Sequence, residues 1–315
     1  MNYPYANGVI KALDLTVLDK SKLVKWMKLD EEAFLKTLVE YGYGNHAFFQ
    51  LEALIQAELQ KTADLFRGII PDQNHLDLFF FSQDAINIKA YYKKKLFQIN
   101  SFDLYLPTGT FSKEELEQAI IQVNLGVLPK NKQKLFLAIQ TVLEDGCSPK
   151  VLSALIDNAI ILHALNELKS KPSPALKSYF THLVDYTNMT TLLRCREIGW
   201  DEADLKPMLL DGGTIAKEQF AMAVTQSKEE IWQRFKNEDF ERIAKAAKIY
   251  FETKKIEKAE QYFSLLLLDK MKAYANDAFT IGPLLYYYLK KQAEAQNLRM
   301  IFADQDIELN DLLDY

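Results

Sequence analysis

The sequence predicts an all-α protein, and three observations lead to that prediction. Gly and Pro together make up 20 of the 315 residues, roughly half of their usual share, and a sheet-rich or loop-rich chain needs more turn residues than that. Apolar residues recur at helical spacing, whereas no segment shows several consecutive alternating strands. Hydrophobic residues make up 49% and charged residues 26% of the chain, which is typical of a folded globular protein.

Three segments are expected to open a helix with the same pattern, apolar-x-Lys-x-x-apolar. These opening segments start at Leu18, Phe111 and Ile215. A Gly-Thr pair precedes the second and the third, at Gly109-Thr110 and Gly213-Thr214. Small and hydroxyl residues directly before an apolar-periodic run are typical of a turn that leads into a helix N-terminus.

A second kind of segment carries apolar residues at positions i, i+3 and i+4. The three examples begin at Leu51, Leu152 and Tyr262. This spacing places the side chains on one stripe of a helix, so each segment is expected to bury one face.

A third kind of segment is a helix with the signature acid-x-x-Asn. The six residues are Asp84 and Asn87, Asp185 and Asn188, and Glu294 and Asn297. A basic residue follows each acid, and we select Lys89, Arg194 and Arg299. Residues at i and i+3 share a helix face, and in an enzyme such a pair could orient water or a metal ion. Its presence three times favours a structural role, in which Asn bonds a backbone group of a neighbouring helix and the acid pairs with a Lys or Arg of the same unit.

The three kinds of segment recur in the same order and at matching distances. The acid follows the first residue of the apolar stripe by 33, 33 and 32 residues. We therefore predict three copies of one helical unit, as domain 1 (1–105), domain 2 (106–210) and domain 3 (211–315). Helical proteins commonly contain apolar stripes, but stripes alone do not explain the constant distance.

The sequence contains no pattern of a catalytic or cofactor site. The four histidines are scattered, and no His or carboxylate lies at metal-ligand spacing on a shared helix face. Neither a phosphate-binding glycine loop nor a Gly-x-Ser-x-Gly elbow is present. We predict no catalytic residue, cofactor, metal or small-molecule substrate. The net charge of −5 argues against binding to nucleic acid.

The sequence also predicts a soluble, cytosolic chain that can still dock on a membrane complex. It has two cysteines, begins without a signal peptide pattern, and has no uninterrupted apolar run of the ~18 residues that a membrane helix needs. The basic run Lys93, Lys94 and Lys95 is a candidate partner contact. A solvated helix face is the simpler interpretation, and contact with an acidic partner or acidic lipid is the other.

The chain resembles the C subunit of the prokaryotic V-type (V/A-type) ATPases, whose eukaryotic relative is the d subunit. The resemblance rests on the opening Tyr3–Ala12, the three acid-x-x-Asn helices and above all the block Pro283–Arg299. It covers essentially the whole chain. Gly8 and Lys11 stand where the family often has Arg.

The resemblance implies an all-α, funnel-like protein of three similar domains in a pseudo-threefold arrangement. It implies a non-catalytic component of the central stalk (rotor), on the cytoplasmic side of the membrane. Such a component is a socket between the central shaft subunits D and F and the membrane rotor ring of proteolipid subunits, and it transmits torque between ATP hydrolysis and ion transport. Whether the ion is sodium or a proton stays open.

Two other classes stay open beside this interpretation. A helical-repeat scaffold unrelated to the ATPase would elongate into an open superhelix and bind peptides along a groove. An all-α enzyme would have an internal pocket with converging titratable groups. For the shaft contact, the loops Tyr41–Asn45, Pro71–His75 and Asp211–Thr214 are further candidates.

Overall fold

The computed structural model describes residues 2–44, 50–98, 105–143, 146–236, 241–303 and 307–315. Every regular element within these residues is helical, so the predicted all-α class is confirmed. Asn45 and His46 lie outside the described residues.

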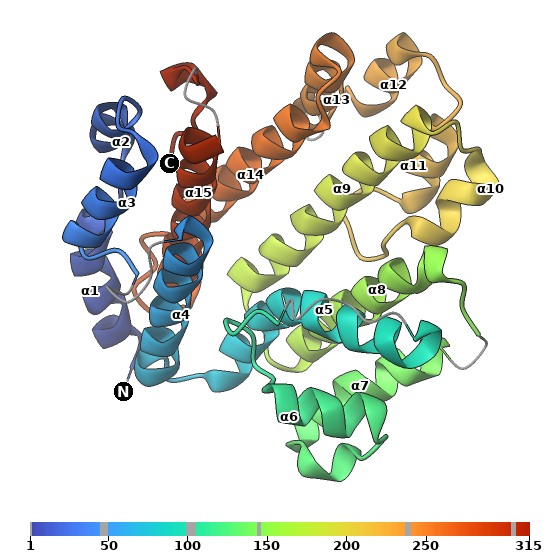
Figure 1. The fold of residues 1–315 in the computed structure, drawn as a ribbon. Coiled ribbons are helices and arrows are strands. Elements are labelled where there is room, and N and C mark those ends of the chain that lie inside the picture. The colour runs from blue at the N-terminus through green and yellow to red at the C-terminus, as the bar shows by residue number, and fades with distance from the viewer. Residues whose placement is uncertain (1, 45–49, 99–104, 144–145, 237–240, 304–306) are drawn as a thin grey trace. The chain divides into compact units, whose positions relative to one another are not determined.

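The chain divides into two compact units, and the first consists of Met1–Leu76 and Leu268–Tyr315. Its helices come from both ends of the chain, and α15 contacts both α1 and α4 (Figure 1). The helical elements that start in this unit or lie in it are α1 (Tyr3–Leu13), η1 (Asp14–Thr16), α2 (Lys20–Trp26), α3 (Glu31–Glu40), α4 (Leu51–Ile69), α5 (Gln73–Phe97), α15 (Gly282–Ala303) and η5 (Leu309–Asp311).

The second unit consists of Asp77–Leu267 and contains most of α5 and α14. Its strongest helix packing joins α7 with α8 and α12 with α13. Its elements after α5 are α6 (Lys113–Leu116), a π-helical turn η2 (Glu117–Ile121), η3 (Leu125–Val127), α7 (Lys130–Leu143), α8 (Pro149–Ser170), α9 (Pro174–Glu197), α10 (Glu202–Leu205), η4 (Lys206–Met208), α11 (Lys217–Ala223), α12 (Lys228–Phe235), α13 (Glu241–Thr253) and α14 (Ile256–Lys272).

The helix starts follow the local sequence. The Asn2 carboxamide caps α1 by accepting from the Tyr5 N–H at 3.0 Å, and the Asp19 carboxylate caps α2 through the Lys22 N–H at 3.0 Å. Ser112 and Glu115 form a capping box at the start of α6. Pro283 is the second residue of α15, where the missing N–H of proline leaves no helical hydrogen bond unmade.

The three predicted apolar stripes lie on α4, α8 and α14, and those of α4 and α8 mostly face the interior. Leu54, Ile55, Leu152 and Ile156 are fully buried, whereas Leu155 is half-buried. On α14, Leu266 is buried, but Tyr262 and Leu265 are half-buried, so the third stripe is only partly covered. Helix α8 is also long and apolar enough to cross a membrane by length and composition, but half of its most apolar stretch is buried inside the protein. The core helices of soluble proteins pass the same test, so α8 by itself is weak evidence for a membrane span.

Candidate functional site

The three acid-x-x-Asn pairs lie on α5, α9 and α15, and all six side chains are buried. None of the six residues is more than 1% exposed to solvent. Each pair faces a non-helical stretch of backbone that precedes or follows another helix. We call each acid-x-x-Asn pair, together with the backbone stretches that it binds, a junction.

In each junction the Asn side chain exchanges two hydrogen bonds with the backbone of a single residue. The amide of Asn87 donates to the Leu106 carbonyl and accepts from the Leu106 N–H, both at 2.8 Å. Asn188 makes the same pair of bonds with Leu210 at 2.9 and 2.8 Å, and Asn297 makes it with Leu313 at 3.0 and 2.7 Å. Asn can do this because its side chain carries a donor and an acceptor side by side, like a peptide group.

In the first two junctions the acid binds the threonine of the Gly-Thr pair and the residue that follows it. The Asp84 carboxylate accepts from the Thr110 N–H at 2.9 Å, from the Thr110 hydroxyl at 2.8 Å and from the Phe111 N–H at 3.3 Å. The Asp185 carboxylate accepts from the Thr214 N–H and the Ile215 N–H, both at 3.1 Å, and from the Thr214 hydroxyl.

The glycines of these pairs let the backbone approach the carboxylates. A Cβ on Gly109 would lie well under 3.0 Å from Asp84 Oδ1, and a Cβ on Gly213 would lie equally close to Asp185 Oδ1. Any side chain at these positions would therefore push the carboxylate out of its hydrogen bonds. The Gly-Thr pairs are thus part of the carboxylate sites, as well as turns before a helix.

The third junction has the same backbone contact but different surroundings. Glu294 accepts from the Leu18 N–H at 2.6 Å, and Leu18 is the third opening residue besides Phe111 and Ile215. No Gly-Thr pair precedes Leu18. Instead the ammonium group of Lys291 contacts Glu294 and lies 3.0 Å from Glu58 Oε1. Lys291 is 2% exposed.

The expected pairing of each acid with a Lys or Arg of the same unit holds for Glu294, which contacts Lys291, but the three basic residues selected from the sequence bind other acids. Lys89 pairs with Asp157 at 2.9 Å, Arg299 pairs with Glu52 at 2.8 Å, and Arg194 pairs with Glu260. The buried acids already receive backbone N–H donors, so the longer basic side chains reach the partly exposed acids of α8, α4 and α14 instead. The Asn bonds also reach non-helical backbone rather than a neighbouring helix.

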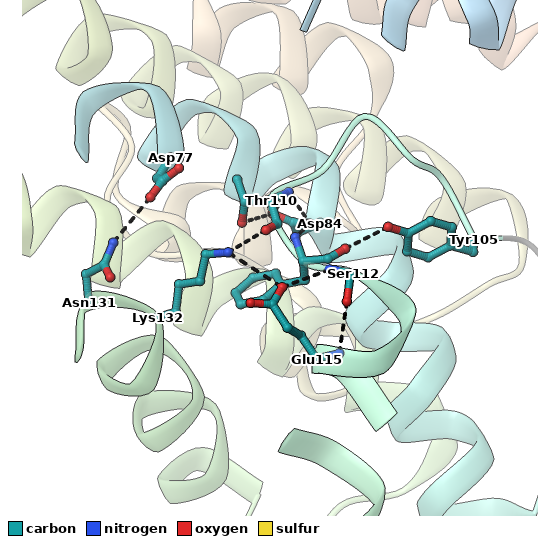
Figure 2. A network of polar contacts seen from close by, with 9 residues as sticks. Asp77, Asp84, Tyr105, Thr110, Ser112, Glu115, Asn131 and Lys132 are labelled. Carbon is teal, nitrogen blue, oxygen red and sulfur yellow. Dashed lines mark hydrogen bonds and ion pairs between the residues drawn. The ribbon is translucent and has the colours of Figure 1, made fainter. Parts of the chain in front are cut away.

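Figure 2 shows the surroundings of Asp84, where a second set of polar contacts holds the Thr110–Ser112 backbone. The Lys132 ammonium donates to the Thr110 carbonyl and lies 3.7 Å from Glu115 Oε2. The Tyr105 hydroxyl donates to the Phe111 carbonyl at 2.8 Å. Both sides of this backbone stretch are therefore fixed, its N–H groups by Asp84 and its carbonyl groups by Lys132 and Tyr105.

Burial changes the protonation of the junction acids. It raises the pKa of Asp84 to about 6, although the Thr110 and Phe111 donors act in the opposite direction. Burial likewise raises the pKa of Asp185. Burial alone would lower the pKa of Lys291, but the charges of Glu294 and Glu58 outweigh it and raise that pKa.

The raised pKa of Asp84 predicts a specific pH dependence of stability. A carboxyl group with a higher pKa in the folded state stabilises the protein at low pH, and this contribution disappears as the pH rises through about 6. When the pH falls from 7.5 to 5, we expect the free energy of unfolding of wild type to rise by roughly 1 kcal/mol relative to that of Asp84→Asn. This is the change that linkage gives for titration over about one pH unit below the folded-state pKa. Urea unfolding of both proteins at several pH values measures the difference. A difference that is constant with pH would contradict the assignment.

The candidate partner contact Lys93–Lys95 lies near the C-terminal end of α5 and does not join the junctions. Lys94 lies 3.5 Å from Glu117 Oε2, and Lys95 is exposed. Of the loop candidates, Asp211–Thr214 belongs to the second junction, because Asp185 binds Thr214. The described residues contain no group of three His, Cys, Asp or Glu side chains that could hold a metal ion.

Sequence reasoning missed Lys291 and Glu58, which complete the third junction. A signal was available, since Lys291 precedes Glu294 by three residues and therefore shares its helix face. Glu58 lies on α4 at a distance of more than two hundred residues in sequence, and no local pattern connects it with Glu294.

Comparison with known proteins gives a consistent result over almost the whole chain. Residues 6–303 match the family described as ATP synthase (C/AC39) subunit. The C subunit of the A-type ATP synthase of Pyrococcus furiosus is 21% identical over 95% of this chain and 85% of its own length. The corresponding protein of Methanosarcina acetivorans is 22% identical over 99% and 91%, and the one of Pyrococcus abyssi is 20% identical over 95% and 85%. The matched region includes all three acid-x-x-Asn helices, and the chain belongs to the ATP synthase (C/AC39) subunit family.

Proposed function

We propose that this chain is a non-catalytic central-stalk subunit that acts as a socket between the central shaft and the membrane rotor ring. In this role it transmits torque between ATP hydrolysis and ion transport. The observation that carries the proposal is the family match over residues 6–303. The proposed partners are shaft subunits D and F and the proteolipid ring, and the proposed location is the cytoplasmic side of the membrane.

The junctions support this role because a socket that carries torque must resist deformation. In each junction the buried Asn side chain binds both the N–H group and the carbonyl group of one loop residue. Breaking these hydrogen bonds is costly because it leaves buried polar groups without partners. Three ion pairs, Lys89–Asp157, Arg194–Glu260 and Arg299–Glu52, add further links between helices. A body fixed in this way transmits force without large internal motion.

The order of the junctions supports three similar domains with the boundaries 1–105, 106–210 and 211–315. The Asp84 helix binds the opening segment at Phe111, the Asp185 helix binds the one at Ile215, and the Glu294 helix binds the one at Leu18. Each predicted domain thus binds the next, and the third binds the first. We propose a pseudo-threefold arrangement of three similar domains, because the same kind of link recurs from each domain to the next.

The proposed role predicts that loss of this chain uncouples the complex. Membranes from cells that lack it should retain ATP hydrolysis by the catalytic head but should lose ATP-driven ion transport, because the torque has no path to the ring. Hydrolysis and ion uptake into inverted vesicles measure the two activities separately. Re-expression of the wild-type chain is the control. Coupled transport at the normal rate in its absence would refute the socket role.

The basic run at the end of α5 is the proposed contact with the ring. Charge reversal by Lys93→Glu, Lys94→Glu and Lys95→Glu together should reduce co-purification of the chain with the ring. The exposed lysines Lys25, Lys28 and Lys177, reversed in the same way, provide a control with the same change of charge. Equal recovery of the ring with both variants would show that Lys93–Lys95 do not contact the ring. The socket role would still be tested by the transport experiment.

A further inference from the structure

The first unit contains a hollow between α1, the end of α14 and the start of α15 that the junctions do not use. Its volume is about 680 Å³, which lies within the range of ligand-binding pockets. Pro4, Gly8, Ile10 and Tyr286 form part of its wall, and Asn7, Lys11 and Lys272 supply polar groups.

Asn7 carries a buried acceptor that is not used within the described residues. Its side chain is 7% exposed, and its Nδ2 donates to the carbonyls of Ala278 at 2.9 Å and Thr280 at 3.1 Å. These carbonyl partners identify the nitrogen of the amide, so the other atom is the oxygen. Asn7 Oδ1 has no hydrogen-bond partner among the described residues. A buried acceptor without a donor is costly, so an occupant with an N–H group would be stabilised here.

The hollow also carries uncompensated positive charge. Lys11 and Lys272 are exposed, and their side chains form no ion pair or hydrogen bond within the described part of the chain. The carboxylates at the hollow have partners of their own. Asp14, which lines it, contacts Lys290, and Asp277, between the lining residues Asn276 and Ala278, accepts from the Phe279 N–H. Asp269 also has an interaction within the chain. The rim therefore favours an occupant with carboxylates.

The edges of the hollow expose apolar surface. Leu15 and Phe279 are 82% and 76% exposed, the highest values among the large apolar side chains of the described residues. Each directly follows a residue that lines the hollow, Asp14 or Ala278. Exposed apolar side chains next to a hollow are typical of surfaces that bind other proteins.

We propose that this hollow is a docking site for an acidic polypeptide segment of another protein. A polypeptide supplies all three kinds of group that the site lacks. Its backbone N–H reaches Asn7 Oδ1, its carboxylates pair with Lys11 and Lys272, and its apolar side chains cover Leu15 and Phe279. A free phosphate supplies only the negative charge. The proposal does not depend on the socket role, because it concerns this surface alone.

A direct test uses the full chain and a labelled seven-residue peptide of alternating glutamate and leucine, acetylated and amidated at its ends. Fluorescence anisotropy should show binding of this peptide and none of the same peptide with lysine in place of glutamate. Lys11→Glu with Lys272→Glu should weaken binding at least about tenfold. Lys25→Glu with Lys28→Glu makes the same change of charge away from the hollow and should leave the affinity unchanged.

A second variant tests the hollow itself without removing any charge. Gly8 lies on α1 at the wall of the hollow, and a Cβ there would meet no atom within 4 Å. Gly8→Leu should fill the space and abolish peptide binding, while the thermal midpoint should not fall, because Leu is a better helix former than Gly. Gly68, an exposed helical glycine of α4 with equally open surroundings, is the matched control as Gly68→Leu.

Several results would overturn the proposal. Absence of peptide binding to wild type would do so, and so would equal binding to the Gly8→Leu and Gly68→Leu variants. Inorganic phosphate and phosphatidylglycerol vesicles distinguish other sources of negative charge. If either of them binds in a way that depends on Gly8 and Lys11 while the peptide does not, the hollow is an anion or lipid site and the polypeptide assignment is wrong.

Discussion

Replacement of Lys291 by Met is expected to destabilise the protein by about 3–5 kcal/mol, the range found when one partner of a buried ion pair is removed. Lys291 lies between Glu294 and Glu58, and at 2% exposure it is the buried cation of the third junction. Met fills a similar volume but leaves two carboxylates without their counter-charge. Urea unfolding followed by circular dichroism should show the loss.

Two further variants separate charge from packing. Addition of Glu58→Gln and Glu294→Gln to Lys291→Met removes the unpaired charges and should restore part of the lost stability, because neutral amides cost less to bury than carboxylates. Lys290→Met changes the neighbouring lysine, whose partner Asp14 is 45% exposed, and should cost less than Lys291→Met. If Lys291→Met and Lys290→Met lower the free energy of unfolding by the same amount, the contacts of Lys291 with Glu58 and Glu294 have no special role in stability.

Replacement of Asp185 by Ala is expected to cost about 2–4 kcal/mol. The change leaves the buried N–H group of Ile215 without an acceptor, together with the part-buried N–H and hydroxyl groups of Thr214. Each unsatisfied buried group costs ~1–3 kcal/mol. The effect should appear in the unfolding free energy and as faster hydrogen exchange at the amides of Thr214 and Ile215, which lose their hydrogen bonds.

Asp185→Asn is the matched control for this prediction. Asn keeps the shape and one carbonyl oxygen, so it can still accept on one side, from the Ile215 N–H or from Thr214, and it should cost less than Ala. Fast exchange should be confined to the second junction, with the Phe111 amide of the first junction unchanged. An Ala variant that is as stable as the Asn variant would show that the carboxylate oxygens contribute nothing.

The helical class and the buried residues of the stripes on α4 and α8 could be predicted because they depend on local spacing. The same holds for the helix starts at Asp19, Ser112 and Pro283, where one or two side chains decide the geometry. The acid-x-x-Asn residues could be selected because they recur at constant distances from the apolar stripes. Recurrence marks a residue as part of the architecture even when its partner is not known.

Most partners of these residues could not be predicted, and Lys89, Arg194 and Arg299 show why. Sequence proximity suggested that each acid would pair with a base of its own unit, and of the three acids Glu294 does so, with Lys291. A buried carboxylate can instead be satisfied by main-chain N–H groups, which every residue except proline carries and which leave no signal in the sequence. The bases were then available for Asp157, Glu260 and Glu52 on other helices.

The third junction joins the two ends of the polypeptide, and this affects how the protein can be made. In the first two junctions, 26 and 29 residues separate the acid from the threonine that it binds, so both can form while synthesis continues. Glu294 instead binds Leu18, 276 residues away, and the Tyr315 hydroxyl donates to the Leu18 carbonyl. The segment around Leu18 must therefore wait for these partners until residues 294–315 have been synthesised. Replacement of Tyr315 by Phe would leave the Leu18 carbonyl without this hydrogen bond.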